Sequence, residues 1–291
     1  MNGKKFNHSK IMVVFACSYK GGSFWFTTKY KNKGENKMQE NELKYYEKTK
    51  NWDFSYIKRK TEKLTDWDFY EKIKENTTRK SLCLDIGTGG GERVLKKYPE
   101  VGMIIATDFS KEMLKTAKEN QKQYPEKRVK FTYMDSREMK FPKETFDLIS
   151  ARHTVINAEQ IYECLVKGGK LIIEGIDKED CQEIKEIFKR GQAYNDKIAI
   201  SEQDYLDLVK AGFKKIERVQ IVENEYYNTE QDLMALLLKV PIIDDFSEIN
   251  NEKFEHRTMI EKDLFDEYVR KYKTEKGILL KRRLYGIIAE K

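Results

Sequence analysis

Short apolar segments alternate with helical segments from residue 81 to residue 176, and this alternation constrains the fold more than any other feature of the chain. Each apolar segment has the length and the β-branched content of a strand, and each intervening segment is amphipathic. Such a pattern is typical of β-α-β units, in which parallel strands form a sheet that helices cover on both faces. The five predicted strands are SLCLDIG, GMIIATD, VKFTYMD, FDLISAR and GKLIIEGI, which begin at residues 81, 102, 129, 146 and 169.

Three helices are predicted between these strands. The first spans residues 92–98 and ends before Pro99, because proline cannot continue a helix. The second spans residues 110–123, and a serine at its start suits an N-cap. The third spans residues 158–167 and is expected to stop at Gly168.

The C-terminal part of the chain breaks the alternation. A helix is predicted over residues 201–212, a sixth strand over 213–222 and a final strand over 283–291. Between the last two strands lies a largely helical insertion at about 223–276. An insertion of this length is not a simple β-α-β crossover, so the last strand can enter the sheet antiparallel to its neighbours.

The N-terminal 80 residues divide into two parts. Residues 38–80 are rich in aromatic side chains and predict a cap of two or three short helices, which packs on the main domain (81–291) or covers its ligand cleft. Residues 1–37 carry eight lysines and one acid, Glu35, and we expect them to form a disordered basic extension. The net charge of +7 belongs to this extension, because residues 38–291 hold 48 basic and 48 acidic side chains. A neutral body argues against a polyanionic partner.

Acidic residues end the first three predicted strands, at Asp85, Asp108 and Asp135. Ligands of open parallel sheets bind beyond the carboxyl ends of the strands, so these acids mark a candidate site. The first acid opens a glycine loop, DIGTGGG, over residues 85–91. Glycine permits left-handed backbone in a tight turn and lets backbone N–H groups approach a ligand closely.

The glycine spacing argues against a dinucleotide. The fingerprint G-x-G-x-x-G requires a third glycine, but that position holds Glu92 when counted from Gly87 and Val94 when counted from Gly89. An acid on either side of the loop is also unfavourable for a pyrophosphate. The loop instead suits a ligand with a positive charge or hydroxyl groups, and a nicotinamide-dependent dehydrogenase is disfavoured.

With these residues the chain resembles class I S-adenosylmethionine (SAM)-dependent methyltransferases. The glycine loop looks like the first motif of that family, and three later segments are similar to its following blocks: ATDFSKEMLKTAKEN, VKFTYMDSREMKFPKETFDLISA and CLVKGGKLIIEG. The resemblance covers about residues 80–176, in the order and spacing of the family. It implies a Rossmann-like sheet of seven strands, mostly parallel with an antiparallel last strand.

The resemblance also implies SAM as the cofactor and a role for each matched residue. The glycine loop would hold the amino-acid part of SAM, and Asp108 would take both ribose hydroxyls, because a carboxylate accepts two hydrogen bonds. Phe109 would pack on the adenine, Asp135 would accept from the adenine amino group, and Arg152 would lie near the methionine end or the acceptor. The implied cofactor-binding residues are Asp85, Gly87, Thr88, Gly89, Gly91, Asp108, Phe109, Met113, Asp135, Ser136 and Arg152.

Metal chemistry is not predicted. The four cysteines form no C-x-x-C pair, and only three histidines are present. Cys83 and Cys164 lie within apolar patterns and are expected to be buried free thiols of a cytoplasmic protein. His153 follows the fourth strand, where a general base could act, and is the candidate catalytic residue; a packing or capping role is the alternative.

The sequence alone is compatible with several classes of methyl acceptor. The Asn/Asp-Pro-Pro-Tyr signature of amino-group methylation on adenine, glutamine or similar targets is missing from SARHTVIN at 150–157. The aromatic cap and the helical insertion predict a pocket for a small or medium-sized molecule, although the same residues could bury a homodimer contact. A run of seven basic residues within 270–283 keeps RNA as the alternative acceptor, and a SAM-binding regulator without catalysis is a third possibility. No apolar run is long enough to predict a membrane span.

Overall fold

The computed structural model describes residues 18–19, 22–23, 52–243 and 260–291. The predicted disorder of residues 1–37 lies outside the described residues, except for two paired strands, β1 (Ser18–Tyr19) and β2 (Gly22–Ser23). The first part of the predicted cap, up to residue 51, also lies outside them. No helix in the described ranges has the length and apolar character required to cross a bilayer.

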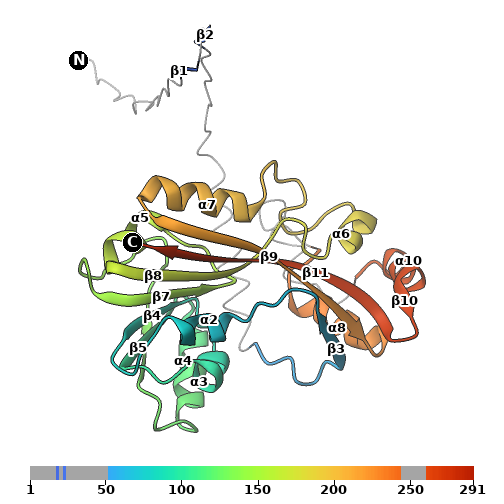
Figure 1. The fold of residues 1–291 in the computed structure, drawn as a ribbon. Helices are drawn as coiled ribbons and strands as arrows, with labels where there is room; N and C mark the ends of the chain where they lie inside the picture. The colour runs from blue at the N-terminus through green and yellow to red at the C-terminus, as the bar shows by residue number, and fades with distance from the viewer. Residues whose placement is uncertain (1–17, 20–21, 24–51, 244–259) are drawn as a thin grey trace, which may run out of the picture.

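A mixed β-sheet forms the centre of the molecule (Figure 1). Its strand order is β3-β9-β11-β8-β7-β4-β5-β6, and a short β10 pairs with β11. Strands β4 to β8 run parallel to one another, whereas β11 runs antiparallel to both β8 and β9. The predicted parallel core with an antiparallel last strand is therefore confirmed. The strands are β3 (Arg59–Lys63), β4 (Leu82–Ile86), β5 (Met103–Asp108), β6 (Val129–Tyr133), β7 (Phe146–Arg152), β8 (Leu165–Ile176), β9 (Lys214–Tyr227), β10 (Lys273–Thr274) and β11 (Gly277–Glu290).

The sheet has nine strands rather than the predicted seven. One addition is β3, so the segment 38–80 is not the all-helical cap that the sequence predicted. Its sequence, RKTEK, has no apolar residue. It forms an exposed edge strand, where charged side chains are common and hide the usual alternation. The other addition, β10, is a two-residue strand at the turn into β11.

Strands β9 and β11 are longer than predicted, at 14 residues each. Because β9 continues to Tyr227 and β11 already begins at Gly277, the helical insertion is shorter than the predicted 223–276. The two strands pair along almost their whole length, from Ile278 opposite Tyr227 to Glu290 opposite Lys214. Together with β3 they form an extension that projects beyond the carboxyl ends of the parallel strands.

Helices cover both faces of the sheet (Figure 1). On one face the apolar sides of α2, α3 and α4 pack with the sheet in a common core, and on the other face α5 and α7 do the same. A third core joins α6, α8 and α10 to the β9–β11 extension. The helices are α2 (Phe69–Glu75), α3 (Glu92–Lys97), α4 (Lys111–Gln121), α5 (Ala158–Cys164), α6 (Gln182–Phe188), α7 (Ile200–Ala211), α8 (Glu230–Lys239) and α10 (Lys262–Tyr272).

Helix boundaries follow local signals in most places. The Ser110 hydroxyl accepts a hydrogen bond from the Met113 N–H at the start of α4, as predicted for an N-cap. Gly212 ends α7 with a left-handed backbone (φ 104°). The predicted helix 158–167 is too long, however. Its chain turns extended at Leu165, which pairs with Phe146, so β8 begins before the glycines that were expected to stop the helix.

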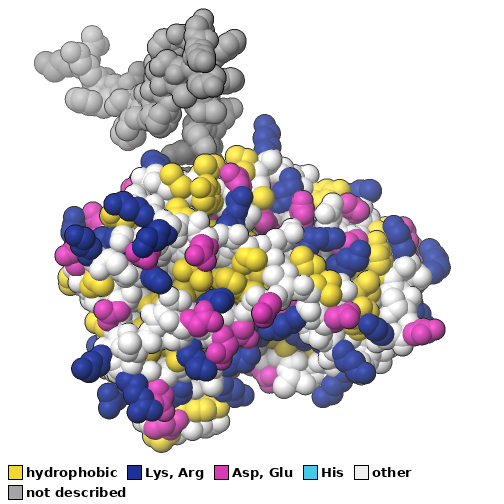
Figure 2. Space-filling view, viewed as in Figure 1, with side chains coloured by type: hydrophobic (Ala, Val, Ile, Leu, Met, Phe, Trp, Pro, Cys, Tyr) yellow, Lys and Arg dark blue, Asp and Glu magenta, His cyan; other side chains and the backbone are white. Residues whose placement is uncertain are grey.

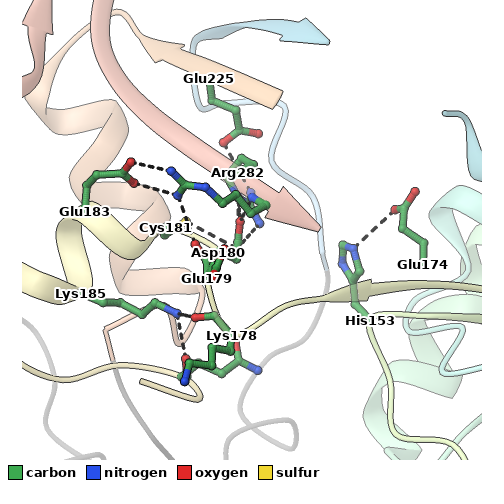
Figure 3. Close-up of polar contacts among 12 residues, drawn as sticks. His153, Glu174, Lys178, Glu179, Asp180, Cys181, Glu183, Lys185, Glu225 and Arg282 are labelled. Atoms are coloured by element: carbon green, nitrogen blue, oxygen red, sulfur yellow. Dashed lines mark hydrogen bonds and ion pairs between the residues drawn. The ribbon is translucent and has the colours of Figure 1, made fainter. Parts of the chain in front are cut away.

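A buried ion network fastens the extension to the rest of the domain (Figure 3). The Arg282 guanidinium on β11 forms a bidentate contact with Asp180, with Nε–Oδ1 and Nη2–Oδ2 distances of 2.9 Å. It also lies 3.5 Å from Glu225 on β9. Both carboxylates are only 4% exposed, so their charges depend on this one arginine and its neighbours for compensation.

We expect Arg282→Met to lower the free energy of unfolding by about 3–5 kcal/mol, because it leaves the buried Asp180 carboxylate without its main counter-charge and removes one of the two arginines beside Glu225. Urea denaturation followed by circular dichroism measures this cost. Lys281→Met is the matched control, since the neighbouring Lys281 forms a more exposed pair with Glu183 and should cost about 1 kcal/mol or less. Equal costs for the two variants would contradict the prediction.

Candidate functional site

The candidate site lies where the strand order of the parallel sheet reverses. The chain passes from β4 outward to β5 and β6 and then returns to β7, on the other side of β4. At the carboxyl edge, Ile86 of β4 pairs with Ala151 of β7. Crevices at such reversal points are where open α/β sheets bind their ligands.

The glycine loop leaves β4 at this point in a left-handed backbone conformation. Gly87, Gly89 and Gly91 have φ values of 72°, 58° and 74°, and the last of them is the N-cap of α3. A Cβ on Gly87 would lie 2.7 Å from the Thr154 Cβ, a distance that side chains do not adopt. The backbone and the available space both require glycine, as the sequence predicted.

Asp108 at the end of β5 fixes the loop through its carboxylate. Oδ2 accepts a hydrogen bond from the Gly89 N–H and Oδ1 accepts one from the Ser110 N–H, both at 2.8 Å. Burial raises the pKa of Asp108, and the two N–H groups act in the opposite direction. Each oxygen has a second lone pair, so the carboxylate can still accept hydrogen bonds from a ligand.

Asp85 lies below the loop and is almost fully buried, with 5% of its surface exposed. Its Oδ1 accepts a hydrogen bond from the Ser150 hydroxyl at 2.7 Å. Burial raises the pKa of Asp85 to about 7, although the Ser150 hydrogen bond lowers it in part. Asp85 is therefore a carboxyl group whose charge a cationic ligand group can stabilise.

The residues predicted to contact the adenine differ in their partners and in their exposure. Asp135 forms a bidentate pair with Arg137 at 2.8 and 2.7 Å, which lowers the pKa of Asp135. Phe109 and Ser136 are partly exposed. Met113 is only 1% exposed, so its side chain belongs to the protein interior.

Arg152 and His153 at the end of β7 both face Glu174 of β8 (Figure 3 shows the histidine contact). Arg152 Nε donates to Glu174 Oε1 at 2.7 Å, and His153 Nε2 lies 3.5 Å from the same oxygen. Burial raises the pKa of Glu174, but Arg152 and His153 outweigh it and lower the pKa to about 2. Burial and the Arg152 charge lower the pKa of His153 to about 4. The imidazole is thus neutral at pH 7 and a weak base.

Trp52 covers the glycine loop. The sequence alone did not identify which residue would do so. A Cβ on Gly89 would lie 2.9 Å from Trp52 Cδ1, so the indole rests directly on the loop. The ring of Phe54 stacks near Trp52, and Lys239 of α8 lies 4.8 Å from the Phe54 ring. Segment 52–58 is therefore held between the loop and α8. The aromatic composition of residues 38–80 suggested a cover over the ligand cleft, but only the structure shows that Trp52 contacts the glycine loop.

Three further residues of the site were not predicted: Tyr70 on α2, Arg93 on α3 and Glu174 on β8. Burial and the nearby Asp85 raise the pKa of Tyr70, which places the tyrosine beside the site. Arg93 follows the glycine loop directly and is influenced by the charges of Arg152 and Glu174. Glu174 had a sequence signal, because it is the one acid in the apolar strand LIIEGI at 171–176.

No group of three or more histidine, cysteine, aspartate or glutamate side chains in the described ranges is arranged to hold a metal ion. Cys83 and Cys164 are free and buried, as predicted, and Cys181 shares these properties.

Residues 83–169 match the model of a protein family described as a methyltransferase domain. The matched segment runs from β4 into β8 and contains the glycine loop, Asp108, Asp135 and Arg152. The match confirms the family resemblance of the sequence motifs over these residues. A comparison with curated proteins finds no match.

Solved structures with a similar fold include a putative methyltransferase from Bacillus halodurans, at 17% identity over 77% of this chain and 98% of that chain, with a TM-score of 0.49. Another is the phosphoethanolamine N-methyltransferase 2 of Haemonchus contortus, at 20% identity, 78% and 53% coverage and a TM-score of 0.47. A third is the [4+2]-cyclase SpnF, at 16% identity, 76% and 80% coverage and a TM-score of 0.46.

We expect Gly89→Ala to be more destabilising than Gly168→Ala, although both glycines have positive φ values, of 58° and 76°. A new Cβ at 168 meets no atom within 4 Å, whereas the one at 89 meets Trp52. The backbone cost of about 1–2 kcal/mol is common to both, and overpacking adds about 1–3 kcal/mol at position 89. Urea denaturation measures the difference, and Trp52→Ala should remove it. If the double variant keeps the full extra cost, Trp52 does not cover the loop.

We expect Asp85→Asn to stabilise the ligand-free protein relative to wild type as pH rises. The folded state holds the Asp85 proton up to about pH 7, whereas the unfolded chain releases it near the ordinary value of 3.8. The unfolded state thus binds fewer protons, and wild-type stability falls as pH rises from about 4 to 7. The gain of the asparagine variant should grow to roughly 1–4 kcal/mol at pH 8. Thermal unfolding at pH 5 and pH 8 measures it, and a pH-independent gain would contradict this explanation.

Proposed function

We propose that this chain, whose residues 83–169 form a methyltransferase domain of the class I, SAM-dependent kind, transfers a methyl group from SAM to a small or medium-sized acceptor. The observation that carries the proposal is the contact between the Asp108 carboxylate and the Gly89 N–H. It joins a hydroxyl-binding carboxylate to a glycine loop at the point where the strand order reverses.

The residues of the loop fit SAM by their chemistry. The left-handed glycine loop lets the backbone approach the amino-acid part closely, and Asp85 supplies a carboxyl group for its ammonium group. The Thr88 hydroxyl is buried, and its interaction with the Asp85 carboxyl lowers the pKa of Asp85. Asp108 keeps free lone pairs for the two ribose hydroxyls. Phe109, Asp135 and the backbone of Ser136 remain the proposed adenine contacts.

When bound, SAM supplies an electrophilic methyl group: the lone pair of the acceptor bonds to the methyl carbon, the carbon–sulfur bond breaks, and its electron pair stays on sulfur. The protein contributes mainly by orientation and by excluding water, because positioning alone can supply several kcal/mol in such a displacement. Trp52 and the segment around it cover the loop and serve this exclusion.

The base role predicted for His153 has little support in the geometry. A side chain with a pKa of about 4 binds a proton too weakly to remove one from most acceptors at neutral pH. His153 instead contacts Glu174 through both its side chain and its backbone N–H, which donates to the Glu174 carbonyl at 2.8 Å. We propose that His153 positions Glu174 and Arg152.

An RNA acceptor is disfavoured by the ion pairs of four of the seven basic residues in the run at 270–283. Arg282 is buried against Asp180, and both Arg283 and Lys281 pair with Glu183. Lys276 lies 3.6 Å from Glu62. In the view of Figure 2, basic side chains are interspersed with acidic ones and form no continuous basic surface. Nucleic-acid binding requires cations that are free to meet phosphates.

Isothermal titration with SAM, followed by transfer of a tritiated methyl group into fractionated cell extract, tests the proposal. Label in the small-molecule fraction supports it, and label in RNA supports the alternative. SAM binding with no transfer to any fraction would identify a non-catalytic regulator. Absence of SAM binding would refute the methyltransferase function itself.

We expect Asp108→Asn to weaken SAM binding at least tenfold, because an amide removes the charge and one of the two acceptors from the ribose hydroxyls. Hydrogen bonds to charged groups contribute about 1.5–3 kcal/mol each. Titration calorimetry measures the affinity. Asp207→Asn, on the exposed side of α7, is the matched control and should leave it unchanged. Equal affinities in the two variants would remove Asp108 from the SAM site.

A further inference from the structure

A cavity of about 420 Å³ lies between helix α2 and the sheet. Helix α2 and the segment just before it form one side of the cavity, and strands β8, β9 and β11 form the other. Pockets that hold small molecules have volumes of roughly 300–1,000 Å³. The cavity is therefore large enough for a small ligand of its own.

The cavity is separate from the candidate SAM site. Lys170, which lines the cavity, pairs with Leu148 near the start of β7, whereas Glu174 of the candidate site pairs with Arg152 at the end of the same strand. Four residues separate the two positions on β8, which corresponds to about 13 Å along the strand. A molecule in the cavity is thus a second ligand, distinct from a methyl donor or acceptor beside the glycine loop.

One wall of the cavity is apolar and tightly packed. Trp67 is only 8% exposed, and its ring rests on β11 at Gly286, where a Cβ would lie 2.5 Å from Trp67 Cζ2. Val219 of β9 and Ile288 of β11 are half-buried and pack against the same core as Trp67. A ligand with an apolar body can cover these three side chains and remove their remaining exposed surface from water.

Hydrogen-bond donors lie beside this wall. Lys170 is half-buried, and its ammonium group donates to the neutral Asn76 Oδ1 at 2.6 Å but binds no carboxylate of the described residues. Glu290 lies opposite Lys170 in the register, but its carboxylate binds Lys215 at 2.8 Å. Trp67 Nε1 is buried and has no hydrogen-bond partner in the described part of the chain. Because an ammonium group has three N–H donors, Lys170 can still donate to a ligand.

The other charges of the cavity are compensated or solvated. Lys72 binds Glu75 at 2.9 Å, and Arg218 contacts Glu202 of α7. The two acids that line the cavity, Glu75 and Glu217, are exposed, so water solvates their carboxylates. The charged group that stands half-buried against the apolar wall is therefore a cation, and it favours an anionic ligand group.

We propose that this cavity is a second ligand site, which takes a small carboxylate with an apolar body. The carboxylate binds the Lys170 ammonium group, and the body, a phenyl ring or a branched alkyl chain, packs on Trp67, Val219 and Ile288. A neutral analogue loses the charge-assisted hydrogen bond. A short anion such as acetate loses the apolar contact. The site does not depend on the proposed methyltransferase function.

The indole N–H signals of the full chain, labelled with ¹⁵N-tryptophan, test this site. The chain has three tryptophans, and the signal that Trp67→Phe removes belongs to Trp67. Titration with phenylacetate or 4-methylpentanoate should shift this signal until it saturates. Phenylacetamide and 4-methylpentanamide lack the charge and should bind at least tenfold more weakly. If neither acid shifts the signal, if an amide binds as well as its acid, or if only the Trp52 signal at the glycine loop responds, the proposal is wrong.

Charge variants identify the group that holds the carboxylate. Lys170→Gln should weaken the acid about tenfold and leave the weak binding of its amide unchanged. Lys167→Gln is the matched control, because Lys167 lies on the same strand but is exposed and outside the cavity. Glu217→Gln should leave the affinity equal or increase it. A loss of affinity in Glu217→Gln without one in Lys170→Gln would show that the cavity binds a cation, against the proposal.

A variant that fills the cavity tests the position of the apolar body. Val219→Phe changes no charge but occupies the space beside Trp67 and Ile288, and it should abolish the saturable shift of the Trp67 signal. Thermal unfolding establishes that each variant is folded at the temperature of the titration. A folded Val219→Phe protein that binds the acid like wild type would place the ligand outside the cavity and contradict the proposal.

Discussion

The hydrogen bonds of the Asp108 carboxylate are the interaction on which the rest of the site depends. One oxygen holds the Gly89 N–H of the glycine loop and the other holds the Ser110 N–H at the start of α4, so a single side chain connects two β-α turns of the sheet. The loop has left-handed backbone at three positions and few side chains to pack, and this anchor fixes its course. A ligand that bonds to the same carboxylate therefore meets a loop whose conformation is already set.

The β9–β11 extension adds a part to the sheet that the family match does not cover. These strands pass beyond the carboxyl edge, and a separate apolar core under α6, α8 and α10 supports them. The buried Arg282 joins the extension to the loop before α6 through Asp180. The family match ends at residue 169, before β9 begins. The proposed donor contacts thus lie in the matched segment, and the extension lies outside it.

The sequence predicted the strand ends, the left-handed glycine loop and the Ser110 cap because their signals are local. Strand-end acids, a glycine loop and the Ser110 cap each act within a few residues. The β9–β11 extension depends on pairing between distant segments, and there the sequence was less informative. Strand β3 has no apolar residue to mark it. The basic run at 270–283 kept RNA as an alternative acceptor, and the structure pairs its Arg282 with Asp180, about a hundred positions earlier. The number of charged residues in a segment does not show which of them form ion pairs, because pairing depends on the fold.

Several partly buried ion pairs lie beside the candidate site, and stability alone does not explain them. Replacing a buried ion pair with well-packed apolar residues is often neutral or stabilising, so pairs such as Arg152–Glu174 and Arg282–Glu225 are poor explanations for stability alone. They form instead an arrangement in which adjacent arginines and glutamates keep each other charged and oriented, as the low pKa of Glu174 shows. A polar acceptor entering such a site exchanges its water for fixed charges that need no reorganisation during transfer. An apolar acceptor would bind less favourably here, because it would displace water from these charges without forming hydrogen bonds or ion pairs with them.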